Sequence, residues 1–214
     1  MSGVSTFVWG PSLWRVMHTL SFGDVHELRT HEPAIAKFLT CLQDVLPCRH
    51  CRDSYKTFLT ELPDVHHALQ TDTFRRWMYD LHDKVNVKLQ TASPSFDMVV
   101  KRYAVRPVQW TNADVCDVIA LIGINYRADV ATSYETFWST LPTVLRAGRP
   151  TEPAIAQLLH RTPTPVNTET FIAVAILVDS VLHNHRAPTS TEVDVRTKMY
   201  RRAVSGSCQN GVCA

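Results

Sequence analysis

The amino-acid sequence predicts an all-α protein. Apolar residues recur every three or four positions through most of the chain, and prolines separate these stretches from one another. Only 7 of the 214 residues are glycine, which disfavours an architecture built from many tight turns. The spacing, the prolines and the low glycine content together favour a run of helices over strands.

The composition is that of an ordinary soluble globular protein, with 45% hydrophobic and 20% charged residues. A net charge of +2 is too small to indicate nucleic-acid binding, so we expect no nucleic-acid partner. No apolar run reaches the length of about 18 residues that a membrane span needs, and residues 1–7 do not resemble a secretory signal peptide. We therefore expect no membrane partner and an intracellular location.

Five helical patterns are expected in the first half of the chain. They are, in order, a helix opened by Pro11 and stopped by Gly23, one over about 32–46, one from Cys48 and Cys51 to Pro63, one over about 73–89, and a short element near 95–103. In the second pattern Ile35, Phe38 and Leu42 fall on one face. Pro47 ends this pattern, because proline has no N–H to donate inside a helix.

More helical patterns follow the step from Arg106 to Pro107, which indicates a boundary because the residue before proline disfavours helix. They cover about 112–127, 133–146, 152–160 and 168–183. Their apolar side chains, such as Trp110, Trp138 and Phe171, would form a second helical core. We predict three parts: a domain over 1–106, an additional helical domain of unassigned role over 107–190, and a flexible tail over 191–214.

Four of the 6 cysteines form two close pairs, Cys48 with Cys51 and Cys208 with Cys213. In a reducing compartment, clustered cysteines are more often redox-active or metal-binding than structural. Cys116 lies on an apolar helical pattern, where we expect an inert buried thiol.

The Cys48–Cys51 pair is expected at the start of a helix. Unpaired N–H groups and the positive end of the helix dipole there lower the pKa of a thiol and make its thiolate more reactive. Arg49, His50 and Arg52 add positive charge. Two intervening residues also allow a disulfide across one turn, so the pattern suits dithiol–disulfide exchange.

Two other interpretations of this pair stay open. The cysteines could be half of a zinc site, for which four histidines could supply nitrogen ligands: His50, His66, His67 and His82. They could also be inert thiols. No second Cys-x-x-Cys pair follows at zinc-finger spacing. A redox pair on helices, without the strands of a thioredoxin fold, needs another electron acceptor, which indicates a bound cofactor.

Three segments of the first half follow one another in order: Trp9-Gly10-Pro11-Ser12-Leu13-Trp14 followed by His18, then Leu46-Pro47-Cys48-Arg49-His50-Cys51, then the helical run from Trp77 through His82, Val85 and Asn86 to Leu89. In this order they resemble the motifs of the Erv/ALR family of FAD-linked sulfhydryl oxidases. Ser95-Phe96-Asp97 fits the short segment that follows. The resemblance covers about residues 9–103.

The resemblance implies a four-helix bundle with a short fifth helix, holding FAD beside a Cys48–Cys51 disulfide. Cys51 would face the flavin, and Cys48 would be attacked by thiols of protein substrates. The residues lining FAD would be Trp9, Trp14, His18, Trp77, His82, Val85, Asn86 and Lys88. The implied reaction forms protein disulfides and reduces molecular oxygen to hydrogen peroxide.

The residues themselves agree in part with this assignment. His82 and Asn86 are four positions apart, so one helix face presents both to a single ligand. Judged without the motifs, the tryptophans would be ordinary core residues and the histidines ordinary polar groups.

Some positions depart from the family pattern. Asp83 stands where the family has asparagine, which puts an amide contact to the adenosine in doubt. Tyr79 and the segment 60–62 replace cysteines of a structural disulfide, and Met98 replaces another cysteine. Tyr103 stands where the family has a later tryptophan. A reduced set of disulfides is typical of the shorter viral members, which suggests a virion or host-cytoplasm location. We also expect a homodimer.

The second pair, Cys208 and Cys213, lies in a glycine-containing tail. A dithiol on a mobile segment has a high local concentration at the active site, which suits a shuttle of electrons from substrate to the Cys48–Cys51 pair. The alternative is a tail whose cysteines are inert. For the whole chain, the alternative functions are a zinc-stabilised or a catalytically inactive helical interaction module.

Overall fold

The structure is a computed structural model that describes residues 5–105, 109–149, 153–184 and 188–203, and these residues form helices and no strand. The α-helices are α1 (Thr6–Ser21), α2 (Val25–Thr30), α3 (Glu32–Val45), α4 (Arg49–Glu61), α5 (Val65–Gln70), α6 (Phe74–Lys88), α7 (Phe96–Val100), α8 (Asn112–Gly123), α9 (Ala131–Gly148), α10 (Pro153–Arg161), α11 (Thr168–Asn184) and α12 (Ser190–Ala203). The predicted all-α class is confirmed. None of the helices described combines the length and apolar character needed to span a bilayer.

Helix α1 begins earlier than the sequence predicts. The Ser5 side chain accepts a hydrogen bond from the Phe7 N–H at 3.3 Å and caps the helix, so the prediction that Pro11 opens it is wrong. Pro11 lies inside the helix, where it forgoes one backbone hydrogen bond. Most of the following turns are buried, including Val16, Met17 and Leu20.

The turn between α3 and α4 carries the first cysteine pair. Helix α3 ends at Val45, Leu46 is extended, and Cys48 is the N-cap of α4. The Tyr55 hydroxyl donates to the Leu39 carbonyl at 2.9 Å and ties α4 to α3. The prediction that the Cys-x-x-Cys pair lies at a helix start is confirmed.

The remaining helices of the first half are α2, α5, α6 and α7. Helix α6 matches the predicted span closely, whereas the short helices α2 and α5 are additions to the predicted set. Helix α7 continues into one π-helical turn over Lys101–Val105, which brings Arg102 and Tyr103 back towards α1.

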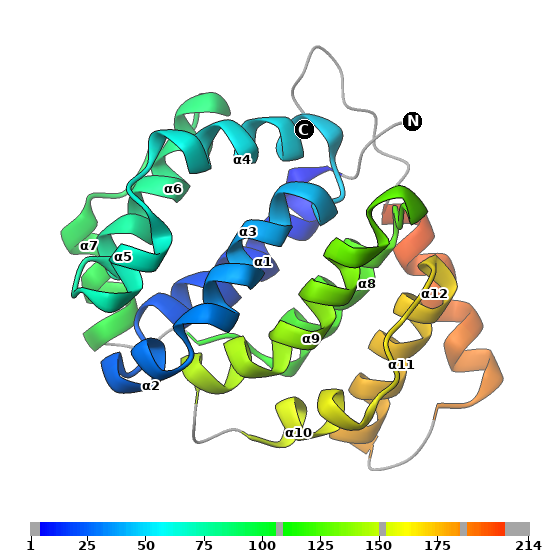
Figure 1. Ribbon diagram of the computed structural model, residues 1–214. Coiled ribbons are helices and arrows are strands. Elements are labelled where there is room, and N and C mark those ends of the chain that lie inside the picture. The colour runs from blue at the N-terminus through cyan, green and yellow to red at the C-terminus, as the bar shows by residue number, and fades with distance from the viewer. Residues whose placement is uncertain (1–4, 106–108, 150–152, 185–187, 204–214) are drawn as a thin grey trace.

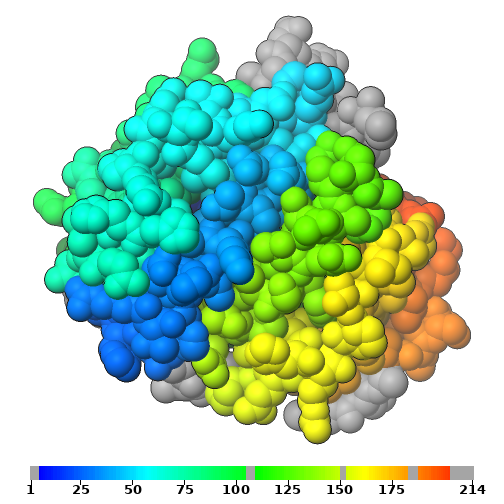
Figure 2. Space-filling model, in the orientation of Figure 1, coloured from blue at the N-terminus to red at the C-terminus, as the bar shows by residue number. Residues whose placement is uncertain are grey.

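The second half packs directly on the first. Helix α9 lies along α3, and α8 lies between α1 and α11 (Figure 1). The rings of Phe38 on α3 and Phe137 on α9 are 5.7 Å apart. Figure 2 shows the blue surface of the first half and the green surface of the second in contact along this junction. The expected second core does not form separately, because the buried apolar residues of both halves join in one cluster.

Helix α8 ends before Arg127, where the sequence predicts its end. The helix stops at Gly123, and a loop over residues 124–127 leads into a 3₁₀ turn at Ala128–Val130. A Cβ atom on Gly123 would lie 2.1 Å from the Cβ of Phe171, so the close crossing of α8 and α11 requires glycine here.

The prediction of a flexible tail over 191–214 is wrong for residues 191–203. Its first residues form helix α12, which lies on α11. Tyr200 donates to Asp117 at 3.3 Å, Arg201 pairs with Glu169 at 3.2 Å, and Arg196 pairs with Asp179. The sequence of 191–203 is polar because one face of α12 is solvated, not because the segment lacks structure. Cys208 and Cys213 lie outside the described residues.

Candidate active site

A cavity of about 360 Å³ opens between α1, α4, α6 and the π-helical turn after α7. Its apolar wall comes mainly from Trp9 and Trp14 on α1, Phe58 on α4, and Val85 on α6. Cavities of this size with apolar and aromatic walls are typical binding sites for cofactors.

The charged side chains that line the cavity are basic. Arg15, Lys88 and Arg102 reach its wall, and among the described lining residues there is no aspartate or glutamate. Lys88 contacts the Ser54 hydroxyl and donates to the His50 carbonyl at 3.2 Å. This basic lining favours an anionic ligand such as a phosphate-bearing cofactor.

The cysteine pair lies at the edge of this cavity. Cys51 lines it, whereas Cys48 is fully buried behind it at the N-terminus of α4. The Cys51 thiol and the backbone N–H groups of Cys51 and His50 bond to the Cys48 sulfur and lower its pKa to about 6, against the opposing effect of burial. The same bond and burial raise the pKa of Cys51. Cys48 is therefore the sulfur that ionises first.

Trp14 and His82 stack in the wall of the cavity, and His18 lies beside them. The ring of Trp14 lies flat on that of His82, with centroids 3.7 Å apart and planes within 6°. Nε2 of His18 and Nδ1 of His82 are 2.8 Å apart. Burial, with the nearby His82 and Arg102, lowers the pKa of His18 to about 3, and burial lowers the pKa of His82 to about 4. Both rings are neutral at pH 7, so one can donate to the other without repulsion.

Comparison with known families matches residues 11–104 to the Erv1 / Alr family. This part of the chain is therefore similar to the Erv1/Alr family. The family comprises FAD-linked sulfhydryl oxidases, so the similarity implies thiol oxidase chemistry for the matched residues in general terms. No curated protein and no solved structure matches the chain.

Most of the residues predicted to line FAD meet at this cavity. They are Trp9, Trp14, His82, Val85, Asn86 and Lys88. His82 and Asn86, four positions apart on α6, both line the cavity. Which of these residues bind FAD stays a prediction.

Two of the predicted residues do not line the cavity. Trp77 is buried in the core, its ring beside Phe74 and its indole N–H donating to the Pro63 carbonyl at 2.8 Å. His18 lies one layer behind His82, and its Nδ1 is buried without a protein partner among the described residues. His18 can therefore affect this site only indirectly, through its contact with the His82 ring.

The sequence prediction missed several residues of the cavity. Arg15, Ser54, Arg102 and Tyr103 all line it. Ser54 could have been found from its position, since it follows Cys51 by three residues and shares its helix face. Arg102 gave no such signal, because the π-helical turn that places it cannot be read from helical spacing.

The zinc interpretation finds no ligand set in the part of the chain that the structure describes. No group of three or more His, Cys, Asp or Glu side chains gathers there in a way that could hold a metal ion. His66 contacts Glu32, and His82 stacks on Trp14.

Proposed function

We propose that the protein is an FAD-dependent sulfhydryl oxidase that forms disulfides in thiol-containing proteins and reduces molecular oxygen to hydrogen peroxide. The observation that carries this proposal is the position of Cys51, one sulfur of a Cys-x-x-Cys pair, in the wall of an aromatic and basic cavity in a region similar to the Erv1/Alr family. An electron acceptor bound in this cavity would lie within reach of Cys51.

The residues present fit FAD. Trp14 and His82 offer flat faces suited to an aromatic ring system, and Lys88, Arg102 and Arg15 offer positive charge suited to its two phosphates. When bound, FAD supplies a two-electron acceptor that oxygen reoxidises.

The chain's own part of the cycle is thiol–disulfide exchange. A substrate thiolate attacks the Cys48 sulfur of the oxidised pair, the Cys48–Cys51 bond breaks, and Cys51 leaves as a thiolate. A second substrate thiolate then displaces Cys48, so the substrate gains one disulfide and the pair two electrons. Lys88 and Arg52 lower the cost of negative charge at Cys51. Because Cys48 is buried, this attack requires a neighbouring segment to move.

An absorption spectrum of the purified protein tests the proposal directly. We expect flavin bands near about 370 and 450 nm that bleach with DTT in the absence of air and return when oxygen is admitted. A colourless protein that binds zinc stoichiometrically would instead support the metal interpretation. A protein that holds flavin without bleaching would be an inactive relative.

We further propose that Cys208 and Cys213 form the shuttle that delivers electrons to Cys48. Support comes from the contacts that fix the end of α12. Arg201 pairs with Glu169, and the neighbouring Thr168 donates to the Ile124 carbonyl. Asn125, the residue after Ile124, donates to the Pro47 carbonyl in the turn before Cys48. Cys208 follows Ala203, the last residue of α12, by five positions, and five positions span at most roughly 17 Å.

Removal of the residues after Ala203 should separate two kinds of substrate. We expect kcat/KM for a reduced protein substrate to fall about tenfold or more, because the local concentration of the shuttle is lost. Oxidation of DTT, which reaches the pair without a shuttle, should change less than about twofold. Oxygen consumption with both substrates measures this. An equal change for both would show that the tail cysteines carry no electrons.

A further inference from the structure

The loop after α8 holds the turn that carries the redox pair. The Asn125 side-chain amide donates to the Pro47 carbonyl at 2.7 Å, one residue before Cys48. The Arg127 guanidinium donates to the Asp44 carbonyl at 3.1 Å, in the last turn of α3. Both donors lie beyond residues 11–104, the part of the chain that matches the Erv1/Alr family.

These contacts satisfy carbonyls that the end of a helix leaves without a partner. The last carbonyls of α3 have no donor further along the helix. Arg52, on α4, donates to the Leu46 carbonyl at 2.6 Å. Asp44, Leu46 and Pro47 thus each receive a side-chain donor, and two of these three donors come from the second half of the protein.

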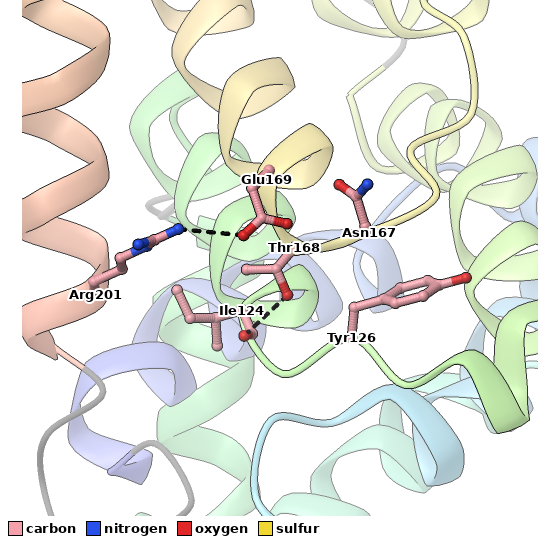
Figure 3. Close-up of a pocket in the computed structure, with 6 residues that line it drawn as sticks. All are labelled: Ile124, Tyr126, Asn167, Thr168, Glu169 and Arg201. Carbon is pink, nitrogen blue, oxygen red and sulfur yellow. Dashed lines mark hydrogen bonds and ion pairs between the residues drawn. The ribbon is translucent and has the colours of Figure 1, made fainter.

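The loop is itself held in place. The Tyr134 hydroxyl donates to the Asn125 carbonyl at 3.2 Å, and the rings of Tyr126 and Tyr134 are 4.6 Å apart. Figure 3 shows the other side of the loop, where the Thr168 hydroxyl donates to the Ile124 carbonyl at 3.3 Å and Arg201 reaches Glu169. A loop bonded on both sides can transmit a fixed position to the turn it contacts.

The loop also brings charge to the turn. The Arg127 guanidinium lies close enough to Arg52 to add to the effect of burial in lowering the pKa of Arg52, and Arg52 in turn interacts with Cys48. The charged or titratable groups around Cys48 are His50, Cys51 and Arg52 on α4, Lys88 on α6, Arg127 on the loop, Tyr134 on α9, and Asp44 on α3, whose carboxylate accepts from Ser133.

We infer that the second half of the protein completes the redox site, with Asn125 and Arg127 as positioning residues that hold the α3–α4 turn so that the Cys48 sulfur meets the N–H groups of α4. The inference rests on the redox role proposed above for Cys48. Neither residue lines the cofactor cavity, so their effect is on the thiol and not on flavin binding.

The test is the pH dependence of Cys48 alkylation in the full-length reduced protein, followed by mass spectrometry of the Cys48 peptide after iodoacetamide treatment. The midpoint of this profile reports ionisation of the thiol, whereas access to the sulfur changes only the plateau rate. We expect a midpoint near 6 in the unmodified protein. In Asn125→Ala and in Arg127→Gln it should rise by about one pH unit, a tenfold change in the ionisation constant.

Matched variants separate positioning from general damage to the interface. Ser133→Ala removes a contact between the halves that ends on the Asp44 side chain and not on a carbonyl of the turn, so its midpoint should stay within about 0.3 pH units. Arg127→Lys keeps a cation and a donor and should recover most of the shift. If Asn125→Ala does not fold, Asn125→Leu, which is neutral and of similar size but has no donor, replaces it.

Two results would overturn the inference: unchanged midpoints in folded Asn125 and Arg127 variants, or an equal shift in Ser133→Ala. The readout needs neither flavin nor oxygen. A shifted midpoint in a protein without oxidase activity would support this inference and contradict the proposed function. Active variants with unshifted midpoints would support the proposed function and contradict this inference.

Discussion

Cys51→Ser should abolish thiol oxidation while FAD stays bound. Serine cannot form the disulfide with Cys48, so the pair can no longer accept electrons from substrate or pass them on. We expect the turnover rate with DTT to fall by at least about three orders of magnitude. Flavin content per chain should stay near that of the unmodified protein, because Cys51 is only one of many residues around the cavity. Oxygen consumption and the flavin absorbance of the purified variant measure the two effects.

Cys41→Ser is the matched control for this experiment. The Cys41 thiol is buried on α3 and donates to the Phe38 carbonyl at 3.1 Å, a bond that a serine hydroxyl also makes. Its activity should stay within about twofold of the unmodified protein. Turnover retained in Cys51→Ser would rule out the Cys48–Cys51 pair as the electron carrier.

Gly123→Ala should destabilise the protein more than other small substitutions. The added methyl would lie 2.1 Å from Cβ and 2.2 Å from Cγ of Phe171, a fully buried side chain. Phe171 has little room to move, because Tyr134 and Trp138 pack around its ring. Overpacking of this kind forces helices α8 and α11 apart, and we expect the free energy of unfolding to fall by about 3 kcal/mol. Urea denaturation followed by circular dichroism measures it.

Gly10→Ala provides the comparison for this stability measurement. Its added methyl meets only Cδ1 of Trp14, at 4.0 Å, and the residue lies inside α1. Because alanine favours helix over glycine, the free energy of unfolding should stay constant or rise by up to about 1 kcal/mol. Equal stability losses in the two variants would contradict the role given to the Gly123–Phe171 contact.

The sequence predicted those features that repeat locally. Helices α3 and α6 show their apolar face as a period and were found with nearly correct bounds. The six-residue helices α2 and α5 have too few positions to show a period and were missed. The three motifs also indicated where the cavity lies, since Trp14, Cys51 and His82, one from each motif, all line it.

Features that depend on contacts between distant parts of the chain were not predicted. Nothing in the local sequence distinguishes Trp77, which is core, from Trp14, which lines the cavity. The hydrogen bond from Asn125 to Pro47 joins residues 78 positions apart and has no sequence pattern of its own. For the same reason the sequence predicts a separate second domain, although α8 and α9 pack on α1 and α3.

The single core has a consequence for the order of events during synthesis. Contacts that join α1 to the second half span about a hundred positions: Arg15 to Asp114 is 99 residues, and Ser12 to Asp117 is 105. Contacts of such high contact order form late, because long loops must close first. As the chain leaves the ribosome, Cys48 emerges long before Asn125 and Arg127, so the thiol pair reaches its final reactivity only after the second half has been translated and packed.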